Sequence, residues 1–174
     1  DRFGSQYDAA EQTQRNNVNI DGLDSGAYSF EPSTGSQVRL NMNGLIPDGR
    51  RIVVYIDGDA YLSQGANGAT FGYENTQWAS RNDIPSLSII VRGDVFIDDD
   101  ITRLDGMYFA QPNPDDATRG GAIVTCSRDG DNYVGPPVNE QAVYDNCAKQ
   151  LTVYGALQAR QVHLLRHVNS ASQA

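Results

Sequence analysis

The sequence is poor in basic residues. It holds a single lysine, Lys149, and 13 Lys and Arg together against 22 Asp and Glu, for a net charge of −9. A chain with this balance lacks the basic face that a nucleic-acid backbone requires, because such binding depends on cations that displace phosphate counterions. An anionic membrane surface is disfavoured for the same reason. The longest largely apolar runs, residues 52–56 and 87–91, fall far short of the roughly 20 residues that span a bilayer. We expect neither a nucleic-acid partner nor a membrane span.

Sequence signatures of several enzyme classes are also lacking. There is no Gly-x-Ser-x-Gly nucleophile elbow and no Gly-rich phosphate loop of the Walker type. His163 and His167 would share one face of a helix and could bind a metal there, but the residues around them favour a strand and two unrelated surface histidines. The sequence therefore predicts no catalytic residue and no resident cofactor.

Glutamate is scarce, whereas aspartate, asparagine and glycine are abundant. Only 4 of the 22 acidic residues are Glu, and the chain holds 13 Asn and 17 Gly. Asp and Asn suit turns, because their side chains bond to nearby backbone groups, while Glu suits helices. The composition therefore predicts an all-β fold of short strands and many turns.

Alternating apolar residues begin at residue 38 and divide the chain into parts. Residues 1–36 are predicted to form a polar N-terminal arm or a strand-donating segment, with short alternating pairs at Val18/Ile20 and Tyr28/Phe30. Strand-like runs cover residues 38–42, 51–62, 87–97, 101–110, 122–126 and 151–165, with long loops at 63–86 and 111–150. We therefore expect one domain over residues 37–168 and a short tail over 169–174.

A glycine recurs at the same place in four of these runs. The pattern is apolar-x-Gly-x-apolar-x-apolar, as in Ile56-x-Gly58-x-Ala60-x-Leu62, and it is centred on Gly58, Gly93, Gly106 and Gly155. Period two puts each glycine on the apolar, inward side of its strand, where it indicates a bend or a close backbone approach. We predict a short irregular β-solenoid, or β-helix, with inserted loops. An antiparallel β-sandwich is the alternative, since the glycine spacings are irregular.

Two stretches carry a resemblance to a known group of proteins. They are IPSLSIIVRGDVFID (residues 84–98) with TRLDGMYFAQP (102–112), and Cys126 followed by CAKQLTVYGAL (147–157). Residues 45–168 resemble the C-terminal β-solenoid-like region of predicted surface proteins from reduced-genome, candidate-phylum bacteria, and more loosely the solenoid regions of pilus-associated proteins. Tyr154 stands where that group is expected to have Asn, at a surface position. The group's function is unassigned, so the resemblance implies a location and a fold but no activity.

The two cysteines of the chain are predicted to form a disulfide. Cys126 and Cys147 belong to a polar, lysine-poor chain that we expect to be exported, and a disulfide is the simplest use of such a pair. Closing the loop between them would stabilise the fold by about 3 kcal/mol. A metal or redox pair is the alternative, but the Cys-x-x-Cys spacing is absent.

Clustered aspartates offer candidate cation ligands. Asp98, Asp99 and Asp100 form a turn whose oxygens could bind calcium, and 129–132 is a second oxygen-rich loop. Asp57, Asp59 and Asp94 lie beside the repeat glycines and point outward together by strand parity. A pair of carboxylates could also hydrolyse a glycosidic bond, but no pair stands out among so many. The simpler interpretation is that these residues are solvated acidic turns.

Three aromatic residues lie close together in the loop after residue 62. Phe71, Tyr73 and Trp78 could stack on a sugar or anchor a partner, and this is the best candidate binding loop in the chain. Alternatively, they fold back and cap the core.

These observations together predict a non-enzymatic structural or adhesive domain at the cell surface or outside the cell, which could serve as a subunit of a self-assembling filament. A carbohydrate-active β-helix enzyme and a calcium-dependent glycan-binding module are the alternatives. The expected partners are a surface glycan, a host protein or a second copy of the chain. Self-association would use residues 1–36, which could add a strand to an exposed sheet edge of another copy. The same segment could instead cover its own molecule.

Overall fold

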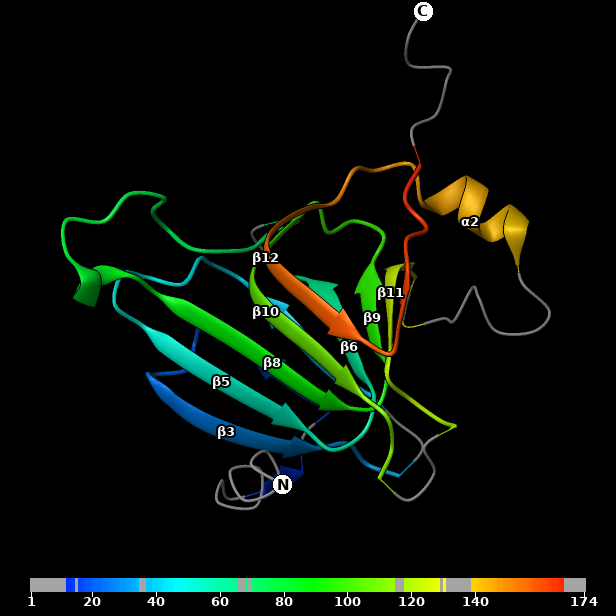
Figure 1. Cartoon of the computed structure of the whole chain (residues 1–174), viewed down its shortest axis with the longest axis horizontal. Helices are drawn as coiled ribbons and strands as arrows, with labels where there is room; N and C mark the ends of the chain where they lie inside the picture. The colour runs from blue at the N-terminus through cyan, green and yellow to red at the C-terminus, as the bar shows by residue number, and fades with distance from the viewer. Residues whose placement is uncertain are drawn as a thin grey trace, which may run out of the picture.

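The fold is mostly β, as the composition predicts, with two sheets packed face to face (Figure 1). The computed structural model describes residues 12–14, 16–34, 37–65, 68, 70–114, 118–128, 130 and 139–167. The predicted tail, residues 169–174, lies outside the described residues, as does most of the second oxygen-rich loop, residues 129–132. Within the described part, no helix has the length and apolar character needed to cross a membrane.

Each sheet is built from strands that pair in parallel. Sheet A holds, in spatial order, β1 (Gln12–Gln14), β3 (Gly26–Glu31), β5 (Arg51–Ile56), β8 (Ser86–Arg92), β10 (Arg103–Gln111) and β12 (Thr152–Ala159), with the short β7 (Thr70–Phe71) beside β10. Sheet B holds β2 (Asn17–Asn19), β4 (Val38–Met42), β6 (Ala60–Gln64), β9 (Val95–Asp98), β11 (Ala122–Ser127) and β13 (Gln161–His163). Every pair between these strands is parallel, so the antiparallel pairing of the alternative sandwich is not found among them.

The chain changes sheet at a bend inside two of the runs that read as continuous strands. Residues 51–62 form β5 and β6, which are separated at Gly58, and residues 87–97 form β8 and β9, which are separated at Gly93. The two bends stack in register, since Ile56 pairs with Val91 and Ala60 pairs with Val95. A run with period two is therefore compatible with a corner, because the alternation continues through it.

The repeat glycines do not share the single inward environment that the pattern predicts. Gly58 and Gly93 lie at bends, whereas Gly106 and Gly155 lie within β10 and β12 and pair with each other. A Cβ atom added to Gly93 would lie 2.5 Å from the carbonyl oxygen of Gly58, and one added to Gly155 would meet the Gly106 carbonyl. In these pairs the missing side chain therefore faces the backbone of the neighbouring strand rather than the core. Close backbone approach is what requires glycine.

The core fills the space between the two sheets with rows of stacked apolar side chains. In β4 the predicted alternation is confirmed, since Val38, Leu40 and Met42 are buried between partly exposed neighbours. One row crosses sheet A through Phe30, Ile56, Val91, Ala110 and Ala159. A row in sheet B runs through Val38, Ala60, Val95 and Ile123 and ends at Val162, which is exposed. Burial of such rows is the dominant stabilising contribution to a fold of this kind.

The strands near the amino end are paired within the molecule. β2 pairs with β4 and β3 pairs with β5, and Val18, Ile20 and Phe30 are all buried in the shared core. The strand-forming pieces that were expected to reach another copy therefore cover their own chain instead. The division of the chain at residue 36 stays a prediction.

A short helix and the disulfide lie beside the carboxyl end of sheet B. The helix α2 (Glu140–Asn146) begins after Asn139, whose side chain accepts a hydrogen bond from the Ala142 N–H. Cys147 follows the helix, and its sulfur lies at disulfide distance, 2.07 Å, from that of Cys126 in β11, in agreement with the predicted pair. The disulfide and its apolar surroundings attach α2 to the sheet.

Candidate functional site

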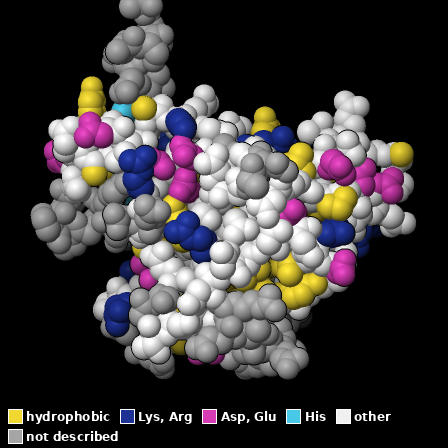
Figure 2. Space-filling view, turned by 180° about the vertical axis from the view of Figure 1, so that it is seen from behind, with side chains coloured by type: hydrophobic (Ala, Val, Ile, Leu, Met, Phe, Trp, Pro, Cys, Tyr) yellow, Lys and Arg dark blue, Asp and Glu magenta, His cyan; other side chains and the backbone are white. Residues whose placement is uncertain are grey.

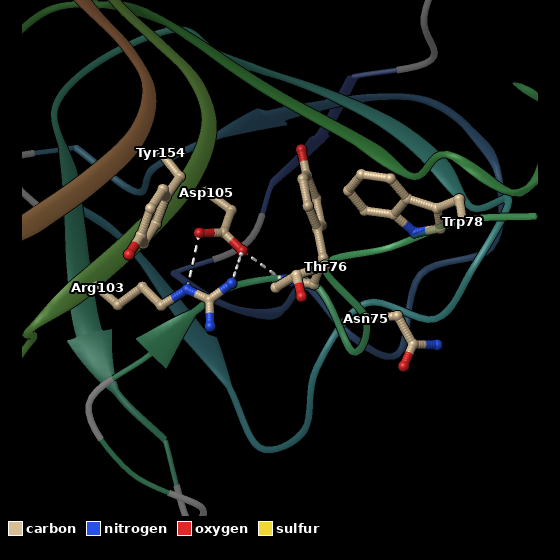
Figure 3. A pocket seen from close by; sticks show the side chains of 7 residues that line it. Asn75, Thr76, Trp78, Arg103, Asp105 and Tyr154 are labelled. Atoms are coloured by element: carbon tan, nitrogen blue, oxygen red, sulfur yellow. Dashed lines mark hydrogen bonds and ion pairs between the residues drawn. The ribbon is translucent and has the colours of Figure 1, made fainter.

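A pocket of about 480 Å³ opens where β10 and β12 begin, beside the loop that follows β7 (Figure 3). Its volume lies within the range typical of ligand sites. Aromatic rings provide most of its walls, and a few polar groups lie among them. We call it the aromatic pocket, and it is lined by Tyr73, Asn75, Thr76, Trp78, Arg103, Asp105 and Tyr154.

A charged pair lies on the β10 side of the aromatic pocket. Asp105 is almost fully buried, and its carboxylate accepts two hydrogen bonds from the Arg103 guanidinium, at 2.9 and 2.6 Å. This bidentate bond raises the pKa of Arg103, so the guanidinium stays charged. The same carboxylate accepts a hydrogen bond from the Tyr73 N–H at 2.8 Å and so holds the loop against the sheet. The Tyr154 ring lies over the guanidinium, and its centre is 5.2 Å from the Arg103 Cζ atom.

Tyr73 joins the loop to the middle of sheet A through its hydroxyl oxygen. That oxygen accepts a hydrogen bond from the Leu87 N–H at 3.0 Å. Burial raises the pKa of Tyr73, the hydrogen bond from Leu87 opposes this rise, and nearby Asp105 adds to it. The Tyr73 side chain is therefore neutral and fixed, so it serves as a rigid wall of the pocket.

Asp48, in the turn before β5, holds the rest of the loop. Its two carboxylate oxygens accept hydrogen bonds from the Asn75 amide at 2.9 Å and from the Trp78 indole N–H at 3.1 Å. Backbone bonds between Ile46 and the loop, at Gly72 and Glu74, add a second attachment. The loop that carries the aromatic side chains is consequently formed before any ligand arrives, which lowers the entropic cost of binding.

The predicted aromatic trio does not act as a unit. Phe71 is buried in the main core, with 1% of its surface exposed, so it caps the core as the alternative proposed. Tyr73 and Trp78 line the aromatic pocket. The sequence analysis missed Arg103 and Asp105, and it assigned Tyr154 only to the surface. Aligning the repeats on Gly106 and Gly155 would have placed Asp105 beside Tyr154, which are paired neighbours in the structure.

A second hollow, of about 360 Å³, lies at the bends between the two sheets. We call it the carboxylate groove, and its charged lining residues are Glu31, Asp57, Asp59, Arg92, Asp94 and Arg119. The three aspartates that strand parity places on one side do lie together here. Asp57 faces Arg92 at 3.7 Å.

Two carboxylates of the groove accept hydrogen bonds from backbone N–H groups. Asp59 accepts a hydrogen bond from the Asp94 N–H at 2.8 Å, and Asp94 accepts one from the Ala122 N–H at 2.8 Å. Each aspartate thus binds the next bend in the stack. Burial raises the pKa of Asp94, the bond from Ala122 lowers it, and neighbouring Asp59 raises it. Each of these bonds uses one oxygen of its carboxylate, and together the contacts indicate a structural role.

The acidic turn at residues 98–100 is surrounded by partners within the protein. Asp98 accepts a hydrogen bond from the Tyr61 hydroxyl, and Asp99 lies 3.6 Å from the Arg128 guanidinium. Asp100 pairs with the Lys149 ammonium. The Arg166 guanidinium donates hydrogen bonds to the backbone oxygens at both ends of the turn, at 2.7 and 3.1 Å. Burial raises the pKa of Asp99, and the neighbouring Asp98 carboxylate raises it further. The three carboxylates lie close enough to hold a metal ion, but these partners favour a structural turn, and the calcium interpretation stays a prediction.

The two histidines lie apart, as the strand interpretation requires. His163 is in β13, and His167 follows that strand and stacks on Tyr144 of α2 at 5.4 Å. Among the described side chains visible on the back of the molecule, acidic and basic residues lie next to one another (Figure 2).

Comparisons of this chain with protein-family models, with curated proteins and with solved structures found no match.

Proposed function

We propose that the chain is a short β-solenoid that serves outside the cell as a non-enzymatic structural and adhesive surface domain. This proposal is supported by the path of the chain, which alternates between two sheets of parallel strands. Successive bends stack in register, as expected of a solenoid. The resemblance to predicted bacterial surface proteins, carried by residues 84–98, 102–112 and 147–157 with Cys126, belongs to the same proposal. A disulfide suits an oxidising compartment outside the cytosol.

The observation that carries the adhesive part is the aromatic pocket. It is held open by Asp48 and Asp105, it exposes aromatic surface, and it lies on a stack of strands that need not move to admit a ligand. By contrast, the clustered carboxylates are bonded to backbone amides and to cations. A rigid aromatic site without reactive groups in place suits recognition better than turnover.

Three measurements test this proposal. Antibodies raised against the folded chain should label intact cells of the source organism as strongly as permeabilised ones; labelling that needs permeabilisation would overturn the extracellular assignment. Beads coated with the chain should bind a surface that uncoated beads do not bind. Release of reducing sugars from polysaccharides incubated with the chain would contradict the non-enzymatic role.

A filament subunit is the second candidate, and one observation favours it. β12 and β13 are the last strands of sheets A and B and lie at the same end of the stack. In β12, Val153 and Leu157 are only partly buried although they continue the core rows. An edge with unpaired backbone groups can accept a strand from another copy. Light scattering at high concentration should then show polymers, and Val153→Lys should abolish them; a monomer at every concentration would exclude this role.

A further inference from the structure

We propose that the aromatic pocket binds one neutral pyranose unit of a glycan, which gives the adhesive function proposed above its ligand class. This inference rests on that proposed function for its setting but on different observations. It uses the ring faces, the charge and the unengaged polar groups of the pocket.

The aromatic faces account for the sugar ring. Figure 3 shows Tyr154 and Trp78 on opposite sides of the pocket, and Tyr73 is a third aromatic residue of its lining. A pyranose has apolar C–H faces and a polar hydroxyl rim, so it can stack on a ring while its edge remains hydrogen-bonded. A flat apolar ligand would offer no hydrogen bond to the Thr76 hydroxyl at the rim of this pocket.

Charge selects a neutral ligand. Arg103 and Asp105 form a closed bidentate pair, so the polar side of the pocket has no net charge. A cationic ligand would meet the guanidinium, which already lies against the ring of Tyr154. An anionic ligand would reach a guanidinium whose charge Asp105 already neutralises, and it would approach a chain whose net charge is −9.

Polar groups in the pocket remain available for hydroxyl groups. Among the described residues, no partner is found for the Thr76 hydroxyl, the Tyr154 hydroxyl or the Nη1 group of Arg103, whose bonds to Asp105 use Nε and Nη2. Together they offer both donors and acceptors, which is what a ring of sugar hydroxyls requires. An aliphatic peptide side chain would use none of them.

Trp78 provides a direct readout, because it is the only tryptophan in the chain. Its emission should be measured during titration with four hexasaccharides: cellohexaose, mannohexaose, chitohexaose and the acidic hexagalacturonate. We expect at least one neutral hexasaccharide to shift the Trp78 emission with saturation, and hexagalacturonate to bind at least tenfold more weakly. Calorimetry on the same samples should give the same affinity.

Matched tyrosine variants locate the site. Tyr154→Ala should weaken binding of the best hexasaccharide at least tenfold by calorimetry. Tyr144→Ala removes an equally exposed tyrosine, 62% against 64%, from α2 and should leave the affinity unchanged. Circular dichroism confirms that both variants fold.

Three outcomes would overturn the inference. They are no binding of any neutral hexasaccharide, tighter binding of hexagalacturonate, and equal effects of the two tyrosine variants. A chain that is labelled on intact cells yet binds no neutral saccharide overturns this inference alone. A chain found only inside cells overturns the proposed function, whatever it binds in solution.

Discussion

The aromatic pocket and the carboxylate groove are similar in size but differ in how their polar groups are used. In the groove, Asp59 and Asp94 each accept a hydrogen bond from a backbone N–H of the next bend, so these side chains extend the hydrogen bonding of the sheet. In the aromatic pocket, Asp105 and Asp48 fix the frame, while hydroxyl groups and ring faces remain exposed to a ligand. The denser cluster of acidic residues is therefore structural, and the sparser collection of aromatic residues is the better site. Residue type alone does not distinguish them, because aspartate holds the frame in both.

The largest expected effect on stability comes from adding a side chain where two backbones are in close contact beneath the groove. In Gly93→Ala the new methyl group would lie 2.5 Å from the Gly58 carbonyl oxygen, and neither backbone can move without shifting a whole bend. We expect a loss of about 2–3 kcal/mol in the free energy of unfolding, measured by urea denaturation. Gly26→Ala is the control, since its nearest contacts are ordinary ones at 3.7 Å. Similar stability of the two variants would mean that the groove is more adaptable than its contacts indicate.

Asp105→Ala should have the next largest effect. It removes both acceptors of Arg103 and the acceptor of the Tyr73 N–H, so about 2 kcal/mol of stability should be lost. Trp78→Ala, on the wall of the same pocket, should cost less than that. Thermal melting of both variants tests whether the pocket consists of a structural frame and an exposed wall, as the comparison requires. Equal losses would remove that distinction.

Asp59 tests whether the groove uses its carboxylates as charges or as acceptors. Asp59→Ala removes the oxygen that binds the Asp94 N–H and should cost about 1 kcal/mol. Asp59→Asn keeps an oxygen in place and should cost less than half as much. Urea denaturation at pH 7 gives both values. If Asn is as damaging as Ala, the negative charge itself matters, and the groove would then deserve study as an ion site.

The smallest effect concerns pH. Burial raises the pKa of Asp94 above its usual value of 3.8, so the folded state holds its proton more tightly than the unfolded state does. The contribution of Asp94 to stability therefore falls as the pH rises from about 3.8 through the raised pKa. Asp94→Asn cannot lose a proton and keeps the acceptor for the Ala122 N–H, so it should flatten this part of the profile. An unchanged slope would show that the carboxylate is not buried in solution.

Much of the fold follows from the alternation of apolar residues, and the limits of that pattern are specific. Val38, Leu40 and Met42 alternate and lie in one strand, as predicted. Residues 51–62 are less strictly alternating, but every second residue other than Gly58 still enters the main core, and they form two strands because the bend at that glycine preserves the period. Parity reports which side a residue faces, but it does not report which sheet the residue belongs to.

The candidate site was only partly predictable, for a different physical reason. Tyr73 and Trp78 are neighbours in one loop, so local sequence could identify them. Arg103 and Tyr154 are far apart along the chain and meet only because β10 and β12 pair in register. The glycine repeat contains this register, since Gly106 opposes Gly155, but only when the copies are aligned as stacked strands.

The stacking of parallel strands also determines an order of assembly. In the middle of each sheet, every strand pairs with one that was synthesised a turn of the stack before it: β8 adds to β5, β10 to β8 and β12 to β10. A chain that emerges from a ribosome or a translocation pore, amino end first, can thus lay each new strand on an edge that already exists. The long separations make each addition slow, but apart from β7, which pairs with the later β10, these additions need not wait for residues still to come. The bond between Cys126 and Cys147 can form only after α2 has followed β11, so oxidation links the most recently synthesised helix to the strand before it.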